Sequence, residues 1–160
     1  MALNSHSYEI SVNWTGNRGT GTSDYKAYGR DHTVDSVGLP TLLGSADKTF
    51  HGDRTRWNPE QLLLSALTQC HMLSYLHVAV NHGIVITKYE DTATGNLVLN
   101  PDGSGQFESA TLHPKIATAD PAMAELALTL HAEAAAKCFI ARSVNFPVGH
   151  EPGVLAATED

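Results

Sequence analysis

The sequence predicts an α+β domain with an antiparallel sheet and two long central helices. Apolar and polar residues alternate in several short runs, which is typical of half-buried strands. Two longer runs repeat apolar residues at helical spacing, and the elements follow one another as strands, helix, strands, helix, strand. The 160 residues contain no internal repeat, low-complexity stretch or linker. We therefore expect a single domain over residues 1–160.

The first third of the chain predicts strands joined by turns. Apolar residues alternate with polar ones from Tyr8 to Trp14, and the Gly-rich turn that follows carries Arg18 at its tip. We expect further strands at residues 20–26 and 32–37. Residues 39–57 then form a long connection rich in Gly, Ser, Asp and Arg. Connections of that length in a small domain are often functional.

The longest predicted helix runs from Asn58 to His82. Asn58 is a suitable N-cap, Pro59 fits the first helical position, and Gln61 stands at the capping-box offset. Gly83 ends the run as a left-handed C-terminal residue would. Seven residues at helical spacing form the stripe that we expect to be buried: Leu63, Ala66, Leu67, Cys70, Leu73, Ser74 and His77.

The second half of the chain predicts a hairpin, a helix and a last strand. Alternation from residue 84 to residue 99, a turn at Asn100–Gly103 and a returning strand at residues 107–118 indicate the hairpin. Asp120 and Pro121 begin a second helix, which runs to about Lys137. A strand at residues 144–148 and a frayed tail at residues 151–160 complete the prediction.

The composition of the chain argues against some classes of binding partner. The net charge is −7 at pH 7 and no basic cluster is present, which argues against nucleic acid and anionic membrane surfaces. We see no signal peptide and no apolar run long enough for a membrane span, so we expect a cytoplasmic protein. Structural disulfides are rare in that compartment. A role in core packing, redox chemistry or metal binding therefore fits the two cysteines better than a permanent disulfide does.

Both cysteines, Cys70 and Cys138, fall on the apolar stripes of the two helices. Helices that pack together lie about 8–10 Å apart, which brings thiols on facing stripes near bonding range. A redox pair would need a cation beside Cys70, because a buried thiol otherwise stays protonated. Arg18 is one candidate, the loop before the helix offers Arg54 and Arg56 as alternatives, and Glu60 is the carboxylate best placed to orient a guanidinium.

The spacing of Glu60 and Cys70 favours a dimer. Ten residues along one helix correspond to a rise of about 15 Å, too far for both to share a small site within one chain unless an arginine bridges them. The simplest arrangement therefore uses a neighbouring chain, with the site at a two-fold interface.

A metal site is an alternative interpretation of the many histidines. The sequence has nine, one of which adjoins Cys70. Their spacing does not match the pairs that zinc sites use, and helix neighbours one residue apart face differently. We therefore expect no metal and no other cofactor. The candidates for this alternative are His71, His77, His82, His113 and His131.

The run Asn-Pro-Glu-Gln-Leu-Leu at residues 58–63, followed by Ala66, Gln69 and Cys70, with a second cysteine near the end of a later helix, resembles the OsmC/Ohr family of organic hydroperoxide reductases and osmotically inducible proteins. The resemblance implies an OsmC-like fold, an intertwined homodimer and two active sites at the interface. It implies that Cys70 is the peroxidatic cysteine and Cys138 the resolving one. Glu60 and Arg18 match the family glutamate and arginine.

The resemblance also implies the chemistry. We expect a thiol-dependent peroxidase that reduces small organic hydroperoxides through a Cys70 sulfenic acid and a Cys70–Cys138 disulfide, with a small thiol or lipoyl-type reductant and no metal or haem. Such an activity belongs to the antioxidant, oxidative-stress response. Apolar residues that we expect to line the substrate site are Phe50, Trp57, Leu63, Leu67 and Phe139.

The sequence departs from the reductases around the second cysteine. Phe139 stands where they usually have proline, residues 134–137 lack their His-Glu pattern, and His71 is not their norm beside the first cysteine. These departures favour a separate OsmC-like branch. They also support an alternative function, a ligand-binding or stress-response dimer of the same fold with weak or no peroxidase activity.

Overall fold

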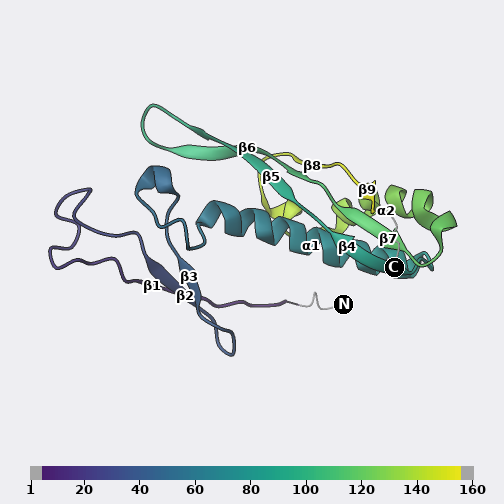
Figure 1. The fold of residues 1–160 in the computed structure, drawn as a ribbon, viewed down its shortest axis with the longest axis horizontal. Helices are drawn as coiled ribbons and strands as arrows, with labels where there is room; N and C mark the ends of the chain where they lie inside the picture. The colour runs from purple at the N-terminus through teal and green to yellow at the C-terminus, as the bar shows by residue number, and fades with distance from the viewer. Residues whose placement is uncertain (1–4, 156–160) are drawn as a thin grey trace. The chain divides into compact units, whose positions relative to one another are not determined.

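The computed structural model describes residues 5–155 (Figure 1). Contacts within the chain divide it into two compact units, one up to Leu62 and one from Leu63 onward. The helix α1, Pro59–Asn81, begins at the end of the first unit and continues through the second. The single domain over residues 1–160 stays a prediction, and each unit is described by itself below.

The first unit contains a three-stranded antiparallel sheet in the order β1-β2-β3. Val12 stands opposite Val34, as the alternation of the first strand predicts. The predicted strand at residues 20–26 is wrong, because this segment forms turns in which Gly21 has a φ of 58°. The strands are β1 at Ser11–Trp14, β2 at His32–Asp35 and β3 at Leu42–Gly44.

The segment 39–57 is not a structureless connection. It supplies β3 and a short 3-10 helix, η1, at Lys48–Phe50. Trp57 N–H donates to the Leu43 carbonyl at 3.1 Å, and Ser45 N–H donates to the Trp57 carbonyl at 2.9 Å. These two bonds hold Trp57 against β3, and so they fix the position of the start of the helix that follows.

The start and end of α1 are those that the sequence predicts. Gln61 N–H donates to Asn58 Oδ1 at 2.8 Å, and Asn58 N–H donates to Gln61 Oε1 at 3.2 Å, which completes the capping box. Gly83 adopts a φ of 69° just beyond the last turn. By length and composition α1 would also pass as a membrane span, contrary to the sequence prediction. The core helix of a soluble protein passes the same test.

The second unit contains two three-stranded sheets, ordered β4-β7-β9 and β5-β6-β8. Each predicted long strand breaks into two, at residues 91–92 and 113–114, where the backbone N–H of His113 donates to Asp91 Oδ1 at 2.9 Å. The first four strands are β4 at Ile86–Glu90, β5 at Ala93–Leu99, β6 at Gly105–Leu112 and β7 at Lys115–Thr118.

The end of the chain also differs from the prediction. The last strands are β8 at Val148–His150 and β9 at Gly153–Val154, which pair in parallel with β6 and β7. The sheets are therefore mixed rather than purely antiparallel. The expected strand at residues 144–148 contributes only its last residue, and the expected frayed tail contains β9. Residues 156–160 of that tail lie outside the described residues.

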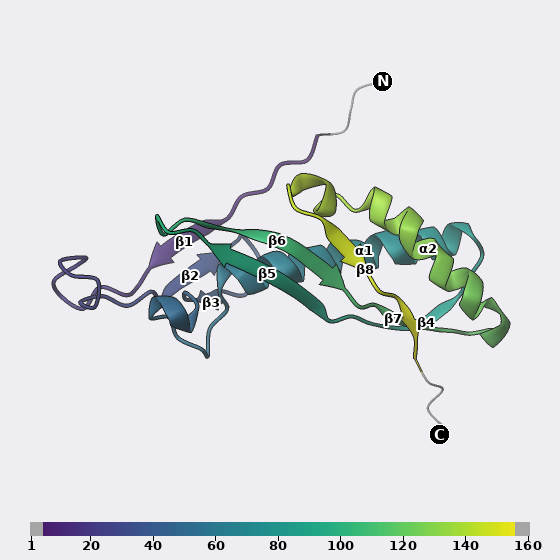
Figure 2. The same ribbon diagram turned by 90° about the horizontal axis from the view of Figure 1, so that it is seen from above.

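The second helix, α2, spans Ala124–Lys137 after the short 3-10 helix η2, Pro121–Met123. Asp120 Oδ1 accepts the Ala122 N–H at 3.0 Å, as the cap-then-proline pattern predicts. α2 lies beside the second half of α1 (Figure 2). Buried residues from both helices, from β7 and from the segment between α1 and β4 form the main core: Tyr75, Val78, Ala79, Ile84, Ile116, Ala127, Leu130 and Ala134.

Candidate active site

The second unit brings the two cysteines together. Cys70 lies in the middle of α1 and is partly exposed, whereas Cys138 follows the last residue of α2 and is 1% exposed. The Cys70 thiol is close enough to Cys138 to raise its pKa, and neither cysteine is in a disulfide. The two sulfurs are therefore near each other as expected, but not through facing helix stripes, because Cys138 follows the last residue of α2.

The turn after α2 aims two consecutive backbone amides at the sulfurs. The helix stops because Cys138 takes an extended conformation, with φ −71° and ψ 112°. Ile140 N–H then donates to Cys70 Sγ at 3.5 Å, and Ala141 N–H donates to Cys138 Sγ at 3.5 Å. Sequence reasoning missed both donors, because the sequence pattern assigns roles to side chains and these are main-chain groups.

The environment of Cys138 favours its thiol form. The pKa of Cys138 is raised to about 11, mainly by burial; the neighbouring Cys70 thiol also raises this pKa, while the amides of Ala141 and Ile140 lower it. Cys138 is therefore protonated at neutral pH while Cys70 is a thiol. Cys70 is the sulfur that a molecule from solution can reach.

A groove of about 660 Å³ opens beside Cys70. Leu73 is 63% exposed and Phe139 is 79% exposed, so the groove has apolar walls that face solvent. Phe139 lines the groove, and its contact with a substrate stays a prediction. The lining consists of Ala66, Gln69, Cys70, Leu73, Ser74, His77, Lys137 and Phe139.

The structure corrects the predicted orientation of α1. The residues of α1 that are fully buried in the second unit are Leu67, His71, Tyr75, Val78 and Ala79, and most of the predicted buried stripe instead lines the groove. Leu67 is 0% exposed against Ala110 and Leu112, so it is a core residue and not a groove residue. Leu63 is half-buried and does not line this groove.

The other predicted site residues belong to the first unit. Glu60 lies in the first turn of α1, and its Oε2 is buried without a hydrogen-bond partner in the described structure. Arg56 is engaged, because its Nε lies 3.9 Å from Asp31 and 3.7 Å from Asp53. Phe50 ends η1 and is half-buried, while Trp57 is half-exposed beside β3.

Arg18 sits on a loop, residues 15–31, that is closed at its base. Trp14 Nε1 donates to the Gly29 carbonyl at 2.8 Å, and Gly29 N–H donates to the Gly16 carbonyl at 2.8 Å. Within residues 5–155, Arg18 and Arg54 form no ion pair. Arg30, which sequence reasoning missed, packs its guanidinium on two tyrosine rings of this loop.

The histidines form a core cluster and scattered surface contacts. His71 Nε2 and His131 Nδ1 are 2.9 Å apart and share a hydrogen bond, and His150 and Tyr75 stack on the pair. Burial lowers the pKa of His71 to about 3 and that of His131 to about 4, so both rings are neutral. Among residues 5–155 no group of three or more His, Cys, Asp or Glu is arranged to hold a metal.

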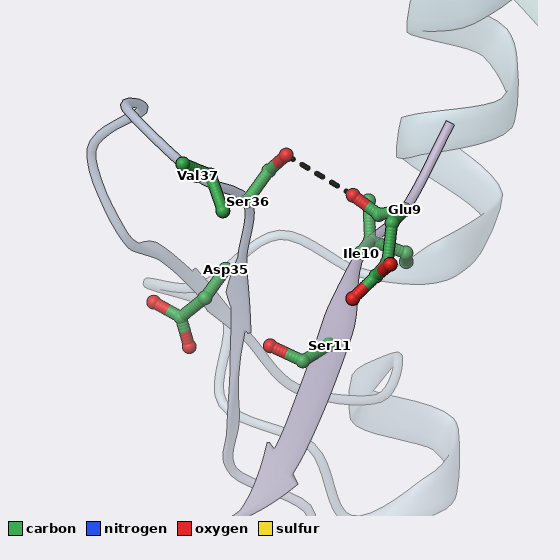
Figure 3. A pocket seen from close by; sticks show the side chains of 6 residues that line it. All are labelled: Glu9, Ile10, Ser11, Asp35, Ser36 and Val37. Atoms are coloured by element: carbon green, nitrogen blue, oxygen red, sulfur yellow. Dashed lines mark hydrogen bonds between the residues drawn. The ribbon is translucent and has the colours of Figure 1, made fainter. Parts of the chain in front are cut away.

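A second hollow, of about 500 Å³, lies at the ends of β1 and β2 (Figure 3). Ser36 Oγ donates to the Glu9 carbonyl across it at 3.1 Å. Asp35 also lines it, and hydrogen bonds from Thr41 and Thr33 lower the pKa of that carboxyl. The hollow is lined by two carboxylates and two serines and contains neither a thiol nor a basic side chain, so the thiol groove is the stronger candidate.

The family model described as OsmC-like protein matches residues 51–151. The chain belongs to this OsmC-like family. A solved OsmC-like protein of unknown function from Vibrio cholerae is 27% identical, with a TM-score of 0.81 over 92% of this chain and 99% of that one. The resemblance seen in the sequence is thereby confirmed, and so is the mixed α+β fold with two helices.

Two further OsmC-like structures share the fold at lower identity. An organic hydroperoxide resistance protein from Legionella pneumophila is 19% identical, with a TM-score of 0.69 over 96% of this chain and all of that one. A putative organic hydroperoxide resistance protein from Vibrio cholerae, with captopril bound in one of its active sites, is 24% identical, with a TM-score of 0.65 over 94% and 93%. No curated protein matched the chain.

Proposed function

We propose that this OsmC-like protein is a cytoplasmic thiol peroxidase that reduces organic hydroperoxides. The observation that carries the proposal is the arrangement of two thiols at one groove. Cys70 is accessible there, and Cys138 lies directly behind it and is 1% exposed. A peroxidase of this type needs one sulfur that meets the substrate and a second that waits close by, shielded from it.

The first step consumes the peroxide. The Cys70 thiolate attacks one peroxide oxygen, so an S–O bond forms and the O–O bond breaks. Cys70 becomes a sulfenic acid, and the departing alkoxide takes up a proton to leave as an alcohol. Sulfur is oxidised by two electrons and the peroxide is reduced by two.

The second step makes the disulfide. The Cys138 thiol loses its proton and its sulfur attacks the Cys70 sulfur, so the S–S bond forms, the S–O bond breaks and water leaves. The neighbouring amide of Ala141 supports the transient negative charge on Cys138. An external dithiol then reduces the disulfide, and a small thiol or a lipoyl-type group fits this role because the groove is open to solvent.

The walls of the groove favour an organic peroxide over hydrogen peroxide. Leu73 and Phe139 expose apolar surface beside Cys70. A peroxide with a hydrocarbon tail gains by covering that surface, at about 25 cal/mol per Å² of apolar area removed from water. Hydrogen peroxide has no tail and gains nothing there.

Activation of Cys70 by an arginine is part of the proposal. Glu60 has an unpartnered buried oxygen and can accept a guanidinium. Arg56 is already paired with Asp31 and Asp53, which favours Arg18 or Arg54 for this role. Arg18 matches the family motif, and its loop is held closed by the Trp14 and Gly29 hydrogen bonds.

A homodimer would cover the apolar surface that the second unit leaves open. Leu73 and Val80 on α1, with Val85 after it, are 63–73% exposed. Burying such residues is the main favourable term in association, and a two-fold interface would also let one chain complete the other's site.

Steady-state reduction of cumene hydroperoxide and of hydrogen peroxide, with dihydrolipoamide as reductant, tests the function. We expect a kcat/KM at least tenfold higher for the organic peroxide, and no turnover for Cys70→Ser. Cys138→Ser should turn over once and accumulate a sulfenic acid that dimedone traps. Leu130→Val, in the core away from the groove, serves as a control for general destabilisation.

The same assay separates the alternative, a ligand-binding dimer with little activity. A binder would consume peroxide no faster than free glutathione at equal thiol concentration, yet its groove would still bind an apolar dye. Peroxide consumption by Cys70→Ser at the parent rate would rule out the assigned chemistry.

A further inference from the structure

The turn that follows α2, residues 138–143, is built to present main-chain donors. Arg142 N–H donates to the Cys138 carbonyl at 3.1 Å, and Ser143 N–H donates to the Ile140 carbonyl at 2.9 Å. Ser143 Oγ adds a bond to the Phe139 carbonyl at 2.8 Å. These three bonds occupy the carbonyls of residues 138, 139 and 140. The N–H groups of Ile140 and Ala141 donate to the two sulfurs instead.

The Ile140 and Ala141 amides serve one thiol each. Ile140 N–H donates to Cys70 Sγ at 3.5 Å, and Ala141 N–H donates to Cys138 Sγ at 3.5 Å. Two consecutive main-chain donors therefore meet the sulfur that reacts first and the sulfur that reacts second.

We propose that the main-chain N–H of Ile140 is a catalytic hydrogen-bond donor that stabilises charge on Cys70, and that the N–H of Ala141 does the same for Cys138. This inference rests on the proposed function and names groups beyond the cysteine, arginine and glutamate side chains. Before the peroxide arrives, the Ile140 donor stabilises the Cys70 thiolate. When Cys138 gives up its proton and attacks the Cys70 sulfenic acid, the Ala141 amide stabilises the forming Cys138 thiolate.

Two features of the site make these donors important. No arginine or lysine of the second unit forms a hydrogen bond to Cys70 among the described residues, and burial works against a charge on Cys138. A fixed main-chain dipole needs no reorganisation when charge develops, which makes it effective in a partly desolvated site. The turn is fixed by its own hydrogen bonds, so the donor is in place before the substrate binds.

Replacing the Ile140 amide by an ester removes this donor with little change in shape. The α-hydroxy acid analogue of isoleucine, introduced at position 140, puts an oxygen where the N–H stands and keeps the side chain. Proline is unsuitable although Ile140 has a φ of −69°, because its ring carbon would replace the hydrogen that points at Cys70 Sγ, 3.5 Å from the nitrogen. Protein made in the same way with isoleucine at position 140 is the matched control that keeps the N–H. Circular dichroism and thermal unfolding identify an ester variant that has not folded.

The first readout is alkylation of Cys70 by iodoacetamide as a function of pH, in a Cys138→Ser background. We expect the ester variant to slow alkylation at pH 7 by about tenfold and to move the profile to higher pH, since a hydrogen bond to a charged group is worth on that order. The isoleucine control should match the parent. A folded ester variant with an unchanged profile would overturn the inference.

A second readout needs no substitution at Ile140. In the ¹⁵N-labelled protein, we expect the Ile140 amide proton to shift with pH along the same curve as Cys70 alkylation, and to lose that response in Cys70→Ser. An amide that does not respond to Cys70 ionisation contradicts the proposal. Neither readout uses a peroxide, so a failure of turnover would count against the proposed function without being mistaken for a failure of the donor.

Discussion

Acid should destabilise this protein well above the pH at which carboxylates protonate. His71 and His131 are buried side by side, and the groups that face them are His150, Tyr75 and Tyr89, with no carboxylate among the described partners. Burial lowers the pKa of His71 to about 3 and of His131 to about 4, and it also lowers the pKa of His150. Their ordinary pKa in an unfolded chain is about 6.5.

The sign follows from proton binding. Between pH 6.5 and 4 the unfolded chain binds protons at these rings and the folded chain does not, so the free energy of unfolding falls as the pH falls. From pH 7 to pH 5 each ring contributes a loss of about 2 kcal/mol, or about 4 kcal/mol for the pair. That is a large share of the free energy of unfolding of a typical domain, which is about 5–15 kcal/mol.

Urea unfolding at pH 8, 7, 6 and 5, at one protein concentration, measures this loss. We expect no contribution from these rings between pH 8 and 7, and a falling midpoint below pH 7. His131→Asn keeps a polar partner for His71 and removes one titrating ring, so the loss from pH 7 to 5 should shrink to about half. Leu130→Val should lower stability by a similar amount at every pH. A variant lacking His131 that loses as much stability as the parent would refute the reasoning.

Three further predictions concern stability. Leu67→Ala should lower the free energy of unfolding by about 2–5 kcal/mol, because Leu67 is fully buried, whereas Leu73→Ala should change it by under about 1 kcal/mol in urea unfolding. Gly16→Ala should open the 15–31 loop to proteolysis, because its Cβ would lie 2.0 Å from the Gly29 carbonyl oxygen; Gly29→Ala, with no contact under 3.4 Å, should not. Asn58→Ala should cost about 1 kcal/mol by the same urea assay, and Asn58→Asp should restore the cap.

The parts of the fold that the sequence predicts well are those encoded by local signals. The start of α1 depends on Asn58, Pro59 and Gln61, which stand within four residues of one another, and its end depends on Gly83. The start of α2 depends on Asp120 and the residue after it. Each of these signals acts through a hydrogen bond or a backbone angle that needs no distant partner.

The strands are predicted less well because their limits depend on distant partners. Residues 84–99 alternate without a break, yet the strand divides at residues 91–92, because Asp91 turns to accept the His113 N–H. β8 and β9 are too short to be recognised from their own residues and exist because β6 and β7 offer them an edge. The proximity of Cys70 and Cys138 is predicted from the sequence, whereas the hydrogen bond from the Ile140 amide to Cys70 depends on the path of a turn.

The orientation of α1 connects these errors to the function. The helix has apolar residues on more than one side, so spacing alone does not tell which side meets α2. The side that meets α2 and the sheets contains His71 and Tyr75, which need polar partners and find them in His131 and the Ala127 carbonyl.

The opposite orientation of α1 would have the more favourable solvation free energy. It would bury Leu73, whose exposed apolar area is unfavourable in water, and it would leave His71 in water, where the ring nitrogen that is now buried without a partner could be hydrated. The observed arrangement instead leaves apolar surface beside the one accessible sulfur. Covering such a surface is favourable in water, and a partner chain and the tail of a hydroperoxide are the two occupants that the proposed function offers.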